Sequence, residues 1–141
     1  MATHQAGIRV IACLFLLAAA PLKVQAQSAD DLAAQVAKRN KKALDEYGKL
    51  NFEEARQLLE AALDFCRANG LEMHPATART YIHLGVLFVT IKQRERGIGS
   101  FRKALAIQPD IKLTKSLASP KIQKAFDEAS ANMPKNEPLD K

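Results

Sequence analysis

The chain has 141 residues, of which 48% are apolar and 26% are charged, and this composition fits one modest globular domain with a single core. Its formal net charge of +6 is suited to acidic protein segments, anionic lipid surfaces or nucleic acid. Two cysteines, one of them near the N-terminus, are too few for a disulfide-held scaffold.

The first 26 residues have the layout of a secretory signal peptide. His4 and Arg9 precede an apolar run over residues 10–20, and residues 24–26 are small or compact enough for a cleavage site. That run is too short for a membrane-spanning helix, which needs roughly 20 apolar residues. We therefore expect export to a periplasmic or cell-envelope location and no transmembrane helix in the mature chain. Export also argues against a nucleic-acid partner, whereas contact with a membrane surface stays open.

Residues from about 29 to 69 predict a first pair of helices. Ser28 can cap the first of them, and its apolar residues then recur at three- and four-residue spacing. Residues 48–51 form a short break before the second helix. Asn69 followed by Gly70 is a good stop for that helix.

Residues 78–111 predict a second pair with a more distinctive spacing. The positions that carry this spacing are Tyr81, Leu84, Gly85, Phe88, Gly97, Phe101, Ala104 and Pro109. The first four fall on one stripe of a helix, and the next three repeat the same rhythm on a second helix. Pro109 ends the pair because proline lacks the N–H that a continuing helix needs.

This spacing resembles the tetratricopeptide repeat, a helix–turn–helix unit of 34 residues. The resemblance is specific over 78–111 and weak over about 29–69, where the second helix matches and the first does not. It implies an all-α fold of stacked antiparallel helix pairs, with about five helices in one domain over residues 27–131. It also implies a role in binding other proteins and no enzyme activity.

Beyond the two pairs, the sequence predicts a capping helix and a disordered tail. Ser119 and Pro120 start a helix over 119–131, with Ser119 as its cap. Residues 132–141 are rich in Pro, Asn, Glu and Lys, which favours a frayed end. Because stacked repeats need about three units to bury a continuous core, we expect the fold to depend on this last helix or on another chain.

The resemblance also implies a binding surface, because the first helix of each pair lines the concave side of such a stack. The residues at the corresponding positions are Arg79, Ile82, His83, Val86 and Val89. They would form an apolar trough with Arg79 and His83 as polar groups, suited to an amphipathic or acidic peptide. The alternative is that the three apolar side chains pack on neighbouring helices.

The sequence shows no recognisable catalytic, cofactor or metal site. His74 and His83 are nine residues apart with no adjacent ligand, and the glycines follow no predicted strand. Cys66 falls on the apolar stripe of its helix, where burial would raise the pKa of the thiol and block attack. A thiol-based enzyme that uses Cys66 is therefore the least favoured hypothesis.

The sequence thus predicts an exported interaction or assembly module of a bacterial cell envelope that binds a partner peptide or helix on its concave face. Self-association is a second option for the partner. The alternative is a structural subunit with an obligate helical interface and no peptide groove. The basic segment 38–42 is interpreted as a solvated face, because its charges spread around the helix.

Overall fold

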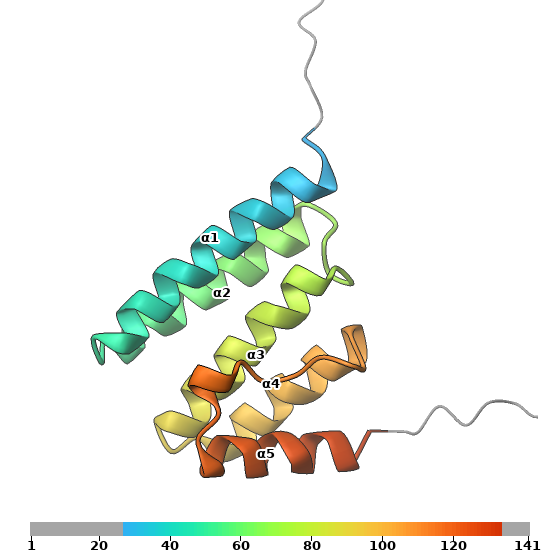
Figure 1. Cartoon of the computed structure of the whole chain (residues 1–141). Coiled ribbons are helices and arrows are strands. Elements are labelled where there is room, and N and C mark those ends of the chain that lie inside the picture. Colours follow the sequence, from blue (N-terminus) through green and yellow to red (C-terminus); the bar gives the residue numbers. More distant parts are fainter. Residues whose placement is uncertain (1–26, 134–141) are drawn as a thin grey trace, which may run out of the picture.

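A computed structural model describes residues 27–133 of the chain (Figure 1). The helices are α1 (Ala29–Gly48), α2 (Phe52–Ala68), α3 (Pro75–Thr90), α4 (Arg94–Ile107), the short 3₁₀ helix η1 (Lys115–Leu117) and α5 (Pro120–Ala131). No strand occurs between residues 27 and 133, and the predicted all-α class is confirmed. The expected signal peptide over 1–26 and the expected tail after Met133 lie outside the described residues.

Three helices begin at a side chain that caps them. Ser28 Oγ accepts a hydrogen bond from the Asp31 N–H at the start of α1, and Ser119 Oγ accepts one from the Ile122 N–H at the start of α5. The start of α3 is capped by the Nδ1 atom of His74, and Pro75 follows in the first turn. These caps satisfy amide groups that have no partner inside the helix, so they set where each helix begins.

The two helical hairpins, α1–α2 and α3–α4, turn through the same backbone conformation. Leu50 in the first turn and Lys92 in the second have φ angles of 66° and 65°. In each turn the next residue donates its N–H five residues back, from Asn51 to Glu46 and from Gln93 to Phe88. This is a known way of ending a helix, which usually places glycine at the left-handed position. The second hairpin is therefore a structural repeat of the first.

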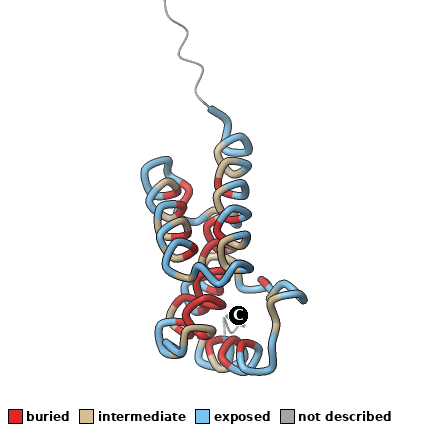
Figure 2. The backbone as a smooth tube through the Cα atoms, turned by 90° about the vertical axis from the view of Figure 1, so that its left-hand side faces the viewer, coloured by how far each residue is buried: buried red, intermediate tan, exposed pale blue. Residues whose placement is uncertain are grey.

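Helix α3 is the centre of the molecule. Eleven of its 16 residues are buried, and the helix contacts α1, α2, α4 and α5. Figure 2 shows the buried residues gathered where the helices face one another, with exposed residues along the outer sides. Helix α5 packs on α4 and α3, and its Phe126 ring meets the Phe101 ring edge to face with 5.4 Å between centroids.

The closest approach is between α3 and α4, at two glycines. A Cβ atom added at Gly97 would lie 2.5 Å from Val89 Cγ2 and 3.0 Å from the Gly85 carbonyl oxygen. A Cβ atom added at Gly85 would overlap the ring of Phe101. Leu84, Phe88 and Phe101 are buried and Tyr81 is half-buried, as the repeat spacing requires. Small residues in α3 and α4 therefore let the aromatic side chains fill the contact.

We expect Gly97→Ala to lower the free energy of unfolding by about 1–3 kcal/mol, because the added methyl group must push α3 and α4 apart. Gly99→Ala is the matched control. A Cβ atom there meets nothing within 4 Å, so the better helix propensity of alanine should raise stability by up to about 1 kcal/mol. Urea unfolding of the two variants measures both effects. Equal shifts in the same direction would contradict the close contact.

Candidate functional site

The first helices of the two hairpins, α1 and α3, lie side by side and form one face of the molecule, which we call the α1–α3 face (Figure 1). Residues 108–119, here called the connector, run back along α3 on this face. Near the start of α3, Arg79 Nη1 donates to the Lys112 carbonyl oxygen at 2.9 Å. Near the end of α3, Val89 and Thr90 share a hollow with residues 116–119. Part of the α1–α3 face is therefore closed by the chain itself.

This placement corrects the expected apolar trough. Ile82, Val86 and Val89 are at most 1% exposed, and they belong to one core cluster with Ile111 of the connector and with α5. They pack on neighbouring elements, as the alternative held, because the connector and α5 cover the side of α3 from which they project. The other two nominated residues, Arg79 and His83, lie elsewhere on α3.

Arg79 and His83 line a hollow between α1 and α3, which we call the α1–α3 hollow. Its volume is about 240 Å³, and its open surface is mostly apolar. The lining residues are Ala37, Asn40, Lys41 and Leu44 of α1 with Ala76, Arg79 and His83 of α3. The α1 side of the hollow was not predicted, because the resemblance over residues 29–69 is too weak to assign positions on that helix. The one sequence feature that points to this wall is the regular spacing of apolar residues along α1.

His83 forms the buried part of this hollow. The side chain is 7% exposed, and its Nδ1 atom has no hydrogen-bond partner among residues 27–133. Burial, together with the positive charge of Arg79, lowers the pKa of His83 to about 4. The ring is therefore neutral near pH 7, with a polar atom that the described chain does not use.

Two polar contacts join α1 to α3, one in the wall of the hollow and one further along the two helices. Asn40 is buried and donates from Nδ2 to Thr80 Oγ1 at 2.9 Å. The hydroxyl oxygens of Tyr47 and Thr90 lie 2.9 Å apart. Asn40 occurs within the basic segment of the sequence, yet it falls on the apolar stripe of α1 between Val36 and Ala43. A polar residue at such a position is a signal that could have identified the contact.

A row of lysines borders the hollow on α1. Lys38, Lys41 and Lys42 line one shallow surface of α1 together with Gln35 and Asp45, and we call these three the α1 lysine row. Arg39 lines the same surface, and its guanidinium stacks on the Phe65 ring, 4.2 Å from the ring centroid. The three lysines are exposed, as expected of a solvated face, whereas Arg39 is half-buried. In the described range, none of the three lysines belongs to an ion pair.

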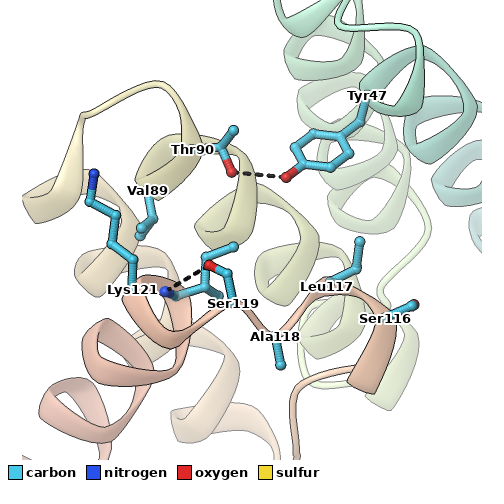
Figure 3. Close-up of a pocket in the computed structure, with 9 residues that line it drawn as sticks. Tyr47, Val89, Thr90, Ser116, Leu117, Ala118, Ser119 and Lys121 are labelled. Carbon is cyan, nitrogen blue, oxygen red and sulfur yellow. Dashed lines mark hydrogen bonds between the residues drawn. The ribbon is translucent and has the colours of Figure 1, made fainter.

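A second hollow of about 440 Å³ lies at the other end of α3 (Figure 3). Tyr47 points across it toward Thr90, and Leu117, Ser119 and Lys121 form its far side. Tyr47 follows Leu44 by three residues on α1, so both hollows lie along the same helix. The α1–α3 face is thus open at two places, with the connector beside them.

Other reactive groups in residues 27–133 form no site. Cys66 is 1% exposed, and burial raises the pKa of its thiol. In that range, no cluster of three or more His, Cys, Asp or Glu side chains could hold a metal ion. None of the described helices is both long enough and apolar enough to cross a membrane. We take the α1–α3 hollow as the candidate site, because it contains two of the residues nominated from the sequence and its open surface is mostly apolar.

The buried His83 predicts a pH-dependent stability. The unfolded chain binds a proton at the ordinary pKa of 6.5, whereas the folded chain does not until about pH 4. Stability should therefore fall as pH falls through this range, by on the order of 3 kcal/mol. His83→Leu should remove this part of the pH dependence and cost little at pH 7, because Nδ1 gives up no hydrogen bond there. Urea unfolding of both proteins between pH 7 and pH 4 measures the pH dependence of stability.

The control for this experiment is Ala61→Ser, which changes an exposed side chain of α2 and adds no titratable group. It should retain the pH dependence of the unaltered protein. The same slope in His83→Leu and in the unaltered protein would show that His83 is not the group responsible.

The thiol of Cys66 should be unreactive while the protein is folded, because it packs with Val36 and Leu71 in a buried cluster. A chain with Cys13→Ser isolates this thiol. We expect its labelling by a thiol reagent to be negligible in buffer and rapid in concentrated urea. Rapid labelling of the folded protein would contradict this expectation and favour the hypothesis of a thiol-based enzyme.

The comparisons with known proteins agree with this architecture. Residues 30–110 match the family model described as tetratricopeptide repeat. No curated protein and no solved structure matches the chain. The family match spans both helical hairpins and more than half of the chain, so the protein belongs to the tetratricopeptide repeat family, and its class of function is protein–protein interaction.

Proposed function

We propose that this protein binds a segment of a partner polypeptide in the α1–α3 hollow. The observation that carries the proposal is the mostly apolar recess between α1 and α3, whose lining includes Arg79 and the buried His83. Apolar recesses with a few fixed polar groups are the usual form of a recognition site. The Asn40–Thr80 contact holds the two walls in place, so little ordering would be needed on the protein side.

The alternative of an obligate structural interface has less support. Such interfaces resemble a protein core cut in half, so they need a broad exposed apolar surface. In residues 27–133, only Leu50 and Met73 are large hydrophobic side chains with high exposure. Leu50 is in the turn between α1 and α2, and Met73 is in the loop between α2 and α3, at opposite ends of the first hairpin (Figure 1). Two separated side chains do not make such a surface.

We also propose that the protein acts after export, in a bacterial cell envelope. Support for this comes from residues 1–26, whose basic start, apolar run and small residues before a cleavage site have the order of a signal peptide. A fold held by packing, with Cys66 buried and unpaired, is compatible with an oxidising compartment.

Site-specific photo-crosslinking tests both proposals. A photoreactive side chain in place of Ala37 faces the hollow, whereas one in place of Ala61 is exposed on α2 and serves as the matched control. In the native cells we expect a discrete crosslinked partner from position 37 and none from position 61. N-terminal sequencing of the crosslinked chain should begin near Gln27.

Crosslinking from position 61 alone, or equally from both positions, would place the binding surface elsewhere. An N-terminus at Met1 in the crosslinked species would contradict export with cleavage. Ile82 is not a suitable position for this experiment, because it is fully buried and its replacement would disturb the core.

A further inference from the structure

We infer that residues 112–118 of the connector, which we call the strap, open away from α3 as a unit while the helices stay folded, and that Arg79 is the latch that holds them closed. This inference does not rest on the proposed function, because it concerns the cover of α3 and not the α1–α3 hollow. It follows from the burial of the strap, its hydrogen bonds and the space beneath it.

The strap is anchored at both ends and weakly packed between them. Ile111 before it and Ile122 in the first turn of α5 are each 4% exposed, and both belong to the core cluster around α3. No residue of the strap itself is buried. Leu113 and Leu117 are half-buried against that cluster, and the two lysines of the strap are exposed. Opening therefore loses much less apolar contact than unfolding a helix does.

The hydrogen bonds of the strap are mostly its own. Its 3₁₀ turn closes on itself, because the N–H groups of Leu117 and Ala118 donate to carbonyl oxygens three residues back. Among residues 27–133, one hydrogen bond joins the strap to another helix, from Arg79 Nη1 to the Lys112 carbonyl oxygen at 2.9 Å. Once this bond breaks, the strap can leave α3 with its own turn intact. Arg79 is therefore placed to act as a latch.

The strap also stands over an unfilled space. The hollow of about 440 Å³ in Figure 3 separates residues 116–118 from Tyr47, Val89 and Thr90. Atoms that face such a space lack the dispersion contacts of a packed interior, which weakens closure. When the strap opens, this hollow extends along the apolar side of α3. The strap thus regulates how much of α3 the folded protein presents.

Helix α5 does not share this freedom. Its Phe126 ring packs edge to face on Phe101 of α4, and its Glu128 pairs with Arg94. Four residues of α5 are buried, beginning with Ile122 in its first turn. The opening therefore ends where α5 begins, and the core between α3, α4 and α5 stays closed.

Two thiols in one chain test the opening. Val89→Cys places a thiol beneath the strap, whereas the native Cys66 lies in a separate buried cluster, and both positions are 1% exposed. In a chain that also carries Cys13→Ser, we expect a thiol reagent to label position 89 at least about tenfold faster than Cys66 in buffer. The rates should be similar in concentrated urea. Local opening uncovers position 89, whereas Cys66 requires a larger unfolding.

Removing the latch separates opening from direct access through the hollow. Arg79→Gln should speed labelling of position 89 by about two- to tenfold, the change in an equilibrium that one hydrogen bond produces, and should leave Cys66 unaffected. Arg102→Gln makes the same substitution on the exposed side of α4 and should change neither rate. The rate at Cys66 reports, in the same molecules, whether a variant has weakened the whole fold.

Limited proteolysis by trypsin is an independent measurement, because cleavage needs a backbone that can leave the surface. We expect the first cuts within residues 27–133 to follow Lys112 or Lys115 of the strap. Lys49 and Lys92, which are exposed in the two hairpin turns, should be cut later.

Three results would overturn the inference. The first is equal labelling of position 89 and Cys66 in buffer, which would mean that α3 is uncovered only when the whole protein unfolds. The second is an unchanged rate at position 89 in Arg79→Gln, which would remove the latch. The third is a first tryptic cut at Lys49 or Lys92, which would place the least stable segment in a hairpin turn.

Discussion

The fold depends on the close approach of α3 and α4, which two glycines allow. Gly97 lies against Val89 and the backbone carbonyl of Gly85, and Gly85 leaves the space that the Phe101 ring fills. That ring is fully buried and packs edge to face on Phe126 of α5. Protein interiors have few voids into which a displaced side chain could move. The contacts at this end of the molecule therefore depend on a backbone separation that a larger residue at 85 or 97 would increase.

Two helical hairpins leave one side of α3 without a third repeat, and the chain covers that side itself. Stacked repeats bury a continuous core only where a neighbour covers each unit. Ile111, Leu113 and Leu117 of the connector pack on the same cluster as Ile82, together with residues of α5. The connector and α5 thus take the place of the neighbour that a third repeat would supply. Because of this cover, the open recess lies on the α1 side of α3.

The sequence was sufficient for the all-α class, the helix caps and the repeat, because these depend on local spacing. It was not sufficient for the turns at Leu50 and Lys92, where side chains other than glycine take a left-handed conformation. Nor could it predict the path of the connector, which depends on which side of α3 lacks a neighbour. Four of the five nominated residues are buried, three of them in the cluster that the connector and α5 cover, and only Arg79 and His83 line the hollow.

The contact between α1 and α3 includes buried and half-buried polar groups, and this explains why the hollow between them persists. Asn40 bonds Thr80 within the contact, and the hydroxyls of Tyr47 and Thr90 meet further along the same two helices. A buried polar group that loses its partner costs about 1–3 kcal/mol, so sliding or rolling α1 toward α3 would be unfavourable. A purely apolar contact has no such penalty and could repack over His83. The polar contacts therefore hold a recess open that hydrophobic packing alone would tend to fill.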